Sequence, residues 1–452
     1  MYPDVQGFID LLNTLDEHPF PPARDLFDRD RELIVTRAPG RLDVMGGIAD
    51  YSGSLVLELP IAEATFAAIQ LNTELRLNLV TLLDDEPHHS SFSMSLRDLE
   101  SAGDYEAARN FFLRDKAWAA YVAGVFLVLM RERDIRFTSG ANILISSRVP
   151  PGKGVSSSAA LEVAVMEAVT KAFNIDVEPR DVALLSQRVE NMVVGAPCGV
   201  MDQMTAVFGE RDRLLALLCQ PAEIKNMIAL PPQLKLWGID SGIRHSVGDS
   251  DYGSVRAGAF MGSRIITDLK ETDLSKRYLA NISPAEFEEK YAARLPERIS
   301  GEAFLAHYGG TSDPVTSIDP QREYAVRLPT AHPIYENARV QRFIDLLTAS
   351  EPHFEELGEL MYASHRSYTA LGLNSDGTDL LVDLMRKEDG LFGAKITGGG
   401  SGGTVAVLGN QTSHTAINKI AKAYANETGH QPHIFSGSSS GSLTFEYVKI
   451  KL

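Results

Sequence analysis

The sequence is poor in cysteine and has no long apolar runs, and each absence excludes a class of protein. Only two of its 452 residues are cysteines, Cys198 and Cys219. Two thiols cannot build a disulfide framework or a multi-thiolate zinc site, and they favour a reducing, cytoplasmic compartment. No apolar run approaches the roughly 20 residues that span a bilayer, and no basic-then-apolar signal segment opens the chain. We therefore expect a soluble cytoplasmic protein with no membrane partner.

Basic clusters and metal-binding histidine patterns are also scarce. The formal net charge is −17, and no group of lysines and arginines with interleaved aromatic residues occurs, so we expect no nucleic-acid partner. The 11 histidines show no H-E-x-x-H or comparable spacing, which argues against a metal-dependent hydrolase. By contrast, 44% of the residues are hydrophobic, which is enough for a large core in two or three domains.

The apolar pattern predicts strands mixed with clustered helices, and this mixture favours an α+β fold over a doubly wound sheet. The pattern of predicted strands and helices changes after Pro231 and Pro232. We place a domain boundary near residue 225, which gives domains of residues 1–225 and 226–452. In the first domain we expect helices at 116–132, 161–173 and 180–193, strands at 33–37, 55–71 and 142–149, and a return toward a strand at 201–208. In the second we expect strands at 234–241 and on both sides of a glycine-rich crossing within 394–408, and helices at 257–268, 285–295, 333–385 and 416–427.

The most informative segment is residues 150–160, Pro-Pro-Gly-Lys-Gly-Val-Ser-Ser-Ser-Ala-Ala, between a predicted strand and a predicted helix. Its glycines let backbone N–H groups approach an anion, and its serines can cap a helix whose positive end favours phosphate. Serine hydroxyls placed there can also reach a phosphate-bound Mg²⁺. The segment is not a Walker loop, because Lys153 is followed by Gly154 rather than by Ser or Thr. It predicts a phosphate cradle, with a plain Gly/Pro connection into a well-capped helix as the alternative.

A second glycine-rich segment, residues 395–404, formally contains G-x-G-x-x-G at Gly398, Gly400 and Gly403. The match is weak evidence for a dinucleotide site, because a predicted strand at 404–408 follows it rather than a helix. Two explanations stay open. One is a tight or bulged hairpin, and the other is a backbone kept bare so that another loop or a phosphate can press against it.

Several charged side chains are candidates for a site. Arg41 and Asp50 lie close to glycine turns, where their side chains can converge on a small ligand. An ordinary solvated loop charge is the alternative for each. Asp202 has apolar neighbours in the sequence, so its carboxylate is poorly solvated unless a cation or hydroxyl faces it. A role as a helix cap is the alternative. Glu190, on a predicted helix, is a candidate second oxygen ligand for Mg²⁺ beside Ser158, with a surface salt bridge as the alternative.

In their order and spacing these elements resemble the GHMP small-molecule kinases. The Arg41 element and the run Pro-Cys-Gly-Val-Met-Asp-Gln at 197–203 look like the galactokinase branch, and within it the chain most resembles the kinase portion of plant-type L-arabinokinases. The similarity covers nearly all of the chain after about residue 30, and its most specific stretches are 40–57, 237–247 and 327–337. The resemblance implies a two-domain GHMP-kinase fold with the active site in the cleft between the domains. It also implies ATP and Mg²⁺ as cofactors, and it leaves the oligomeric state open.

Carried over residue by residue, the resemblance implies a role for each matching position. Asp202 would face the anomeric hydroxyl of a sugar as catalytic base or orienting group, and Arg41 would hold it ionised and offset charge on the transferring phosphoryl. The sugar would lie against Asp50, Gly47, Ile48, Gly199 and Tyr252, and Mg²⁺ would be held by Ser158 and Glu190. The ATP site would comprise Trp118, Tyr121, Gly152, Lys153, Gly154, Val155, Ser156, Ser157 and Ser158. Trp118 and Tyr121 are three residues apart and share one helix face. Core packing would also explain this pair.

One departure from galactokinases bears on the substrate. Their Gly-Glu-His-Thr-Asp stretch is Gly-Gly-Ile-Ala-Asp here, so Gly47 and Ile48 replace the two residues that would meet the C6 hydroxyl. L-arabinopyranose has the ring configuration of galactose without the C6 arm, whereas galactose would bury an unpaired O6 at a cost of roughly 1–3 kcal/mol. We therefore expect phosphorylation of L-arabinose at the anomeric hydroxyl, favoured over galactose by about tenfold to a hundredfold. A galactokinase with relaxed C6 recognition and a non-catalytic sugar and ATP sensor are the alternatives. Arg244 and His245 follow a predicted strand and can approach the sugar.

Overall fold

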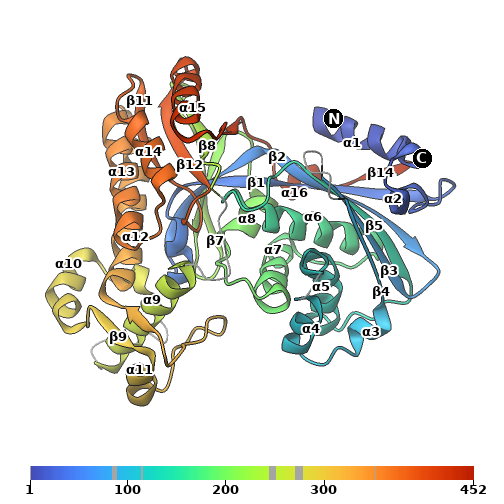
Figure 1. Ribbon diagram of the computed structural model, residues 1–452, viewed down its shortest axis with the longest axis horizontal. Coiled ribbons are helices and arrows are strands. Elements are labelled where there is room, and N and C mark those ends of the chain that lie inside the picture. Colours follow the sequence, from blue (N-terminus) through green and yellow to red (C-terminus); the bar gives the residue numbers. More distant parts are fainter. Residues whose placement is uncertain (1, 84–88, 114–115, 244–250, 270–277, 352) are drawn as a thin grey trace.

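The computed structural model describes residues 2–83, 89–113, 116–243, 251–269, 278–351 and 353–452. Its centre is an eight-stranded sheet with the strand order β14-β1-β2-β5-β3-β4, to which β6 adds along β2 and β7 along β6 (Figure 1). The β3–β5 pair is parallel and the other pairs are antiparallel. The strands are β1 (Glu32–Met45), β2 (Leu55–Asn72), β3 (Arg76–Leu83), β4 (Ser90–Ser95), β5 (Gly140–Ser147), β6 (Arg213–Leu218), β7 (Glu223–Ala229) and β14 (Val448–Lys451).

Helices cover both faces of this sheet because neighbouring strand residues point to opposite sides. In β2, Ala67 packs in the core beneath four helices, while its neighbour Ala68 packs in the core beneath the N-terminal helix. The four helices are α5 (Ala117–Glu132), α6 (Ser157–Ala172), α7 (Pro179–Arg188) and α8 (Met201–Phe208), and the N-terminal helix is α1 (Pro3–Asn13). Short helices at the edges are α2 (Pro21–Arg24), α3 (Leu96–Glu100), α4 (Tyr105–Phe112) and α16 (Ser442–Phe445).

The prediction of a strand at 201–208 is wrong, because this segment is helix α8. A short apolar run does not by itself distinguish a strand from a buried helix. Here Met201, Met204 and Val207 recur every three residues and are buried on one face against the sheet. The Thr205 hydroxyl donates to the Met201 carbonyl one turn earlier, at 2.7 Å. The helix places Asp202 in its first turn.

The second half of the chain forms a four-stranded sheet in the order β11-β12-β8-β13 (Figure 1). Its strands are β8 (Leu234–Asp240), β11 (Leu391–Ile396), β12 (Thr404–Asn410) and β13 (Ile434–Ser436). Its longer helices are α9 (Asp251–Asp268), α12 (Arg327–Leu347), α13 (Phe354–Ala370), α14 (Asp376–Met385) and α15 (His414–Thr428). A small two-stranded sheet, β9 (Arg298–Ser300) with β10 (Glu323–Ala325), lies near α11 (Gly301–Tyr308). The predicted helix at 285–295 is instead broken into α10 (Pro284–Glu286), a π turn and a 3₁₀ turn.

The described structure combines separate sheets with clusters of helices, and this confirms the α+β prediction. The last strand, β14, pairs with β1, so the end of the chain completes the first sheet. The division near residue 225 stays a prediction, and that residue lies within β7. In the described part of the chain no helix is both long and apolar enough to cross a membrane.

A buried ion pair joins the first sheet to the glycine-rich segment of the second. Lys395 of β11 and Asp43 of β1 are both fully buried, and Lys395 Nζ lies 2.6 Å from Asp43 Oδ2. The Asp43 backbone N–H donates to Thr397 Oγ1 at 2.7 Å, and Gly47 N–H donates to Asp43 Oδ1 at 2.9 Å. These contacts fix the first glycine turn and the segment 395–404 relative to each other.

Candidate active site

The predicted phosphate cradle is a turn with repeated left-handed backbone. Gly152 and Gly154 both have φ of 71°, and Ser156, at the N-terminus of the 16-residue helix α6, has φ of 61°. Glycine adopts this conformation at little cost, whereas a side chain makes it strained. The Ser156 hydroxyl is buried and has no hydrogen-bond partner in the described structure. An oriented helix terminus with an unpaired hydroxyl beside it suits a phosphate.

The second glycine-rich segment presses directly on this cradle. A Cβ atom added to Gly403 would lie 2.8 Å from the Lys153 carbonyl oxygen, and one added to Gly398 would lie 2.9 Å from the Gly154 carbonyl oxygen. The Thr404 hydroxyl donates to the Lys153 carbonyl at 2.8 Å. β11 and β12 pair as antiparallel neighbours, so the segment is both a hairpin connection and a backbone kept bare for another loop.

A cavity of about 600 Å³ opens at the cradle and runs between the two glycine-rich segments and α5. The predicted site residues that line it are Arg41, Ile48, Asp50, Trp118, Tyr121, Gly152, Gly154, Ser156, Ser157, Ser158, Glu190, Gly199, Asp202 and Tyr252. Three predicted residues, Gly47, Lys153 and Val155, are not in its wall. Lys153 Nζ instead lies 2.7 Å from Asp240 Oδ2, and the Val155 carbonyl accepts a hydrogen bond from the Arg41 backbone at 3.1 Å. Arg244 and His245 lie outside the described residues.

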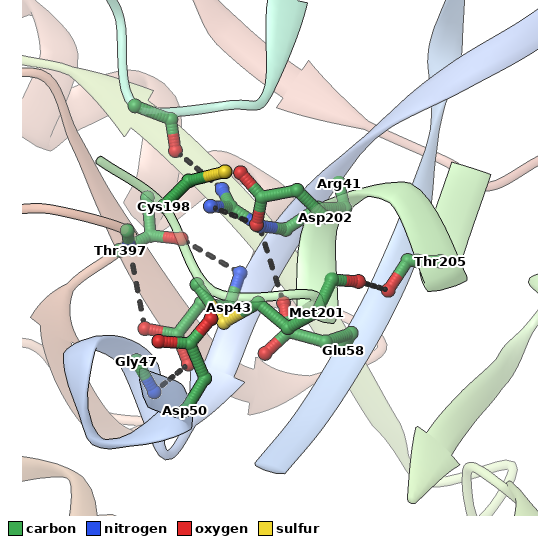
Figure 2. Close-up of polar contacts among 12 residues, drawn as sticks. Arg41, Asp43, Gly47, Asp50, Glu58, Cys198, Met201, Asp202, Thr205 and Thr397 are labelled. Atoms are coloured by element: carbon green, nitrogen blue, oxygen red, sulfur yellow. Dashed lines mark hydrogen bonds and ion pairs between the residues drawn. The ribbon is translucent and has the colours of Figure 1, made fainter. Parts of the chain in front are cut away.

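Arg41 and Asp202 meet at the end of the cradle (Figure 2). Arg41 Nε and Nη2 lie 2.9 Å and 2.8 Å from the same Asp202 oxygen, Oδ1, and Nη1 donates to the Gly154 carbonyl at 2.6 Å. Burial would lower the pKa of Arg41, but the carboxylates of Asp202, Glu58 and Asp43 outweigh burial and raise it. The guanidinium is therefore charged. It connects a carboxylate at the cavity wall to the backbone of the cradle.

Asp50 lies in a short 3₁₀ turn, Gly47–Ser52, and is buried beside Gly199. A Cβ atom on Gly199 would lie 1.7 Å from Asp50 Oδ2, so only glycine fits there. Burial and then the Asp202 carboxylate raise the pKa of Asp50 to about 7, against the opposing charge of Arg256. Hydroxyl donors from a ligand would stabilise a carboxylate in this position.

Glu190, in the cavity wall, shares Gln203 with a second buried glutamate, Glu162, which sequence reasoning missed. Gln203 Nε2 donates to Glu190 Oε2 at 2.7 Å and to Glu162 Oε2 at 3.2 Å, and Glu162 Oε1 has no partner in the described structure. Burial raises the pKa of Glu190 to about 7 and that of Glu162 well above its usual value. The spacing of four between Ser158 and Glu162 on α6 is the signal that could have found the second glutamate.

These groups fit a magnesium ion bound with few protein ligands. Glu162 Oε1 has no hydrogen-bond partner in the described structure, and burial raises the pKa of both glutamates, so a cation beside them would stabilise their charged forms. Among the residues described, no three His, Cys, Asp or Glu side chains gather closely enough to form a full metal cage. Mg²⁺ takes one or two protein oxygens and completes its shell with water and phosphate, so Ser158 and Glu190 suffice.

Trp118 and Tyr121 of α5 also line the cavity, together with Leu161. Trp118 also packs against the helical core, so the packing explanation and the ligand explanation are compatible. Burial, with Glu190 as a second cause, raises the pKa of Tyr121 and keeps its hydroxyl protonated.

Comparison with known proteins places the chain in a family. Residues 120–210 match the GHMP kinases N terminal domain, residues 344–430 match the GHMP kinases C terminal domain, and residues 24–71 match the galactokinase galactose-binding signature. An L-arabinokinase of Arabidopsis thaliana is 46% identical over 95% of this chain and 48% of its own length. A galactokinase of Roseiflexus sp. (strain RS-1) is 30% identical over 89% of this chain and 90% of its own length.

The chain belongs to the GHMP kinase family. It spans about half the length of the Arabidopsis L-arabinokinase and most of the Roseiflexus galactokinase. The crystal structure of Lactococcus lactis galactokinase complexed with galactose superposes with a TM-score of 0.77 at 21% identity, covering 99% of this chain and 100% of that one. The GHMP kinase fold predicted for this chain is thereby confirmed.

Proposed function

We propose that this GHMP kinase transfers the γ-phosphoryl group of ATP to the anomeric hydroxyl of L-arabinose, giving L-arabinose 1-phosphate and ADP. The contact between Arg41 and Asp202 carries the proposal, because it joins the phosphate cradle to a carboxylate within one cavity. The likeness to the Arabidopsis L-arabinokinase supports the choice of sugar. Kinases of this family use ATP, and we place the reaction in the cytoplasm, where two thiols stay reduced.

Asp202 would act on the anomeric hydroxyl. Arg41 Nε and Nη2 both donate to Oδ1 of Asp202. Oδ2 takes no hydrogen bond from another residue of the described part, so it is left for the substrate. The sugar oxygen forms a bond to the γ-phosphorus, the bond from that phosphorus to the β-phosphate oxygen breaks, and the hydroxyl proton passes to Asp202. Arg41 pairs with Asp202 and offsets charge on the transferring group. Phosphoryl transfer needs positioning and charge neutralisation more than covalent chemistry, and this pair supplies both.

The cradle would hold the phosphates through the backbone of Gly152, Gly154 and the serines at the start of α6. We assign Mg²⁺ to Ser158 and Glu190, where it would neutralise phosphate charge when bound. The Lys153 ammonium is engaged by Asp240, so we assign this residue's contribution to its backbone. The adenine would lie beside Trp118 and Tyr121.

The sugar would lie between Asp202 and the turn that carries Asp50 and Ile48. Asp50 would accept hydrogen bonds from ring hydroxyls, while Gly199 and Tyr252 would shape the wall around it. Ile48 presents hydrocarbon to the cavity, which suits a pentopyranose with hydrogen at C5 in place of a hydroxymethyl arm. Galactose is the second candidate, because a galactokinase is 30% identical over most of its length.

A sugar panel tests the proposal. The purified chain is given MgATP with L-arabinose, D-galactose, D-galacturonate and D-glucose, and ADP release and the sugar 1-phosphate are both measured. We expect kcat/KM for L-arabinose to exceed that for D-galactose about tenfold to a hundredfold. Comparable values for both sugars would favour relaxed galactokinase activity, and binding of sugar and ATP without turnover would favour a sensor.

A further inference from the structure

The hydroxyl of Tyr368 occupies the space that a side chain at position 47 would need. Tyr368 lies on α13 in the second half of the chain and is fully buried. A Cβ atom built on Gly47 would lie 1.9 Å from Tyr368 Oη, and Gly47 has φ of 47°. Two observations, the occupied space and the left-handed backbone, therefore require glycine at this position.

The same hydroxyl makes two hydrogen bonds, which join the turn that carries Ile48 to the glycine-rich segment 395–404. The Ile48 backbone N–H donates to Tyr368 Oη at 3.0 Å, and Tyr368 Oη donates to the Gly398 carbonyl at 2.9 Å. Burial, followed by the Asp43 carboxylate, raises the pKa of Tyr368, so the proton needed for the second bond is retained. Gly398 belongs to the glycine-rich segment that presses on the cradle, and the adjoining Gly399 lines the cavity.

Resting on the proposed function, we propose that Tyr368 is a positioning residue that sets the sugar selectivity of this kinase. By filling the space at position 47 and holding the amide of Ile48, it leaves the hydrocarbon of Ile48 and the Asp50 carboxylate to face the sugar from this turn. A sugar whose extra hydroxymethyl arm points at Ile48 would meet hydrocarbon there instead of a side chain at position 47 that could pair with its hydroxyl. The selectivity thus comes from two segments that lie 320 residues apart in the sequence.

The direct test is Tyr368→Phe, which removes the hydroxyl and keeps the buried ring. Binding of L-arabinose and of D-galactose is measured by calorimetry without ATP, and KM for both sugars and for ATP is measured alongside. We expect L-arabinose affinity to fall roughly fivefold to thirtyfold, because both hydrogen bonds of the hydroxyl are lost. Galactose affinity should fall less or rise, so the preference ratio drops at least fivefold while KM for ATP stays within about twofold. Tyr362→Phe is the matched control, because Tyr362 is a buried tyrosine of the same helix that packs in a different core cluster.

A double-mutant cycle tests the steric part. Gly47→Ala places a methyl group against the hydroxyl and should weaken sugar binding and lower Tm. Gly47→Ala combined with Tyr368→Phe should recover part of both losses, because the 1.9 Å overlap with the hydroxyl is removed. The approaches to Asp43 Oδ2 at 2.8 Å and to the ring carbon Cζ at 3.1 Å remain. If Gly47→Ala binds no sugar, the Tm values of the single and double variants still report the coupling.

The proposal is overturned if Tyr368→Phe leaves the preference ratio within twofold of the unmodified enzyme, if Tyr362→Phe changes that ratio equally, or if the double variant is additive. Failure of the proposed function would appear in the unmodified enzyme and not in the variants. It would show as an unmodified enzyme with no preference for L-arabinose, whereas the effect of Tyr368 on galactose binding would still be measurable.

Discussion

Arg41 of β1 and Asp202 of α8, which lie 161 residues apart in the sequence, are joined by two contacts from Nε and Nη2 to a single carboxylate oxygen. A third donor, Nη1, reaches the Gly154 carbonyl. A planar guanidinium can serve these acceptors at once because its donors are fixed in a fork, whereas an ammonium group is a single point of charge.

Arg41→Lys should therefore lower kcat by about a hundredfold or more, as for the loss of one preorganised donor in a buried site. ATP binding should change little. Arg37→Lys is the control, because Arg37 lies on the same strand and is 1% exposed against 3% for Arg41, but it contacts Asp4 and Ser439 away from the cavity. The control should lose stability without a matching loss of kcat. Equal effects of the two variants on kcat would contradict the role of Arg41.

Gly199→Ala should raise KM for the sugar at least tenfold while KM for ATP stays nearly unchanged. The new Cβ would lie 1.7 Å from Asp50 Oδ2 and would displace the carboxylate that we assign to ring hydroxyls. Gly253→Ala, on α9 near the same cavity, is the control because nothing lies within 4 Å of its added Cβ. Initial rates with each substrate varied in turn separate the two KM values. An unchanged sugar KM in Gly199→Ala would remove Asp50 from the sugar site.

Ser158→Ala and Glu190→Gln should each raise the Mg²⁺ concentration for half-maximal rate by about tenfold or more, since each would lose a proposed ligand. Direct Mn²⁺ titration with ATP, followed by electron paramagnetic resonance, measures the same loss without turnover. Glu167→Gln is the control, as this buried glutamate of α6 bonds to Ser442 and lies outside the cavity wall. Mn²⁺ affinity equal to that of the unmodified protein in both site variants would disprove the assignment.

The raised pKa of Asp50 predicts how stability depends on pH in the sugar-free protein. The folded state holds the Asp50 proton up to a pH of about 7, whereas an unfolded aspartate releases it near pH ~4. Between these values the unfolded state binds fewer protons, so the contribution of Asp50 makes unfolding easier as pH rises and becomes constant above about 7. Asp50→Asn lacks this contribution. The stability gained by the variant should therefore grow between pH 5 and 7, to the order of a few kcal/mol.

Denaturant unfolding of both proteins at pH 5, 6, 7 and 8 measures this difference. A gap in unfolding free energy that is the same at pH 5 and pH 8 would mean that Asp50 is ionised throughout in the folded state.

The sequence predicted the local parts of the site well because they depend on short-range chemistry. The glycines and serines of 150–160 specify a left-handed turn before a helix, and α6 begins at Ser157, within this segment and four residues before the predicted helix. The contact of Arg41 with Asp202 was expected only through family resemblance, because no periodicity reports a pair so far apart. Lys153 shows the limit of the motif, since its partner Asp240 lies on a strand of the other sheet.

Position 47 shows a second limit. Sequence comparison identified Gly47 as a changed sugar contact, but its meaning depends on Tyr368, whose hydroxyl fills the vacated space from a helix of the second half. The helix at 201–208 was missed because eight apolar-rich residues fit a strand and a buried helix equally well. Packing against the sheet and the neighbouring helices decides between them, and packing is not a local property.

The most direct test of the account is the turnover of Asp202→Asn, with Asp202→Ala beside it, on L-arabinose and MgATP. The Asn variant keeps the size of the side chain but cannot take the proton of the anomeric hydroxyl. We predict that kcat falls by about 10²- to 10⁴-fold while the ATP dissociation constant, measured by calorimetry, stays within a few fold. Turnover close to that of the unmodified enzyme would contradict the assignment of Asp202 as the group that acts on the sugar, and with it the proposed chemistry of this cavity.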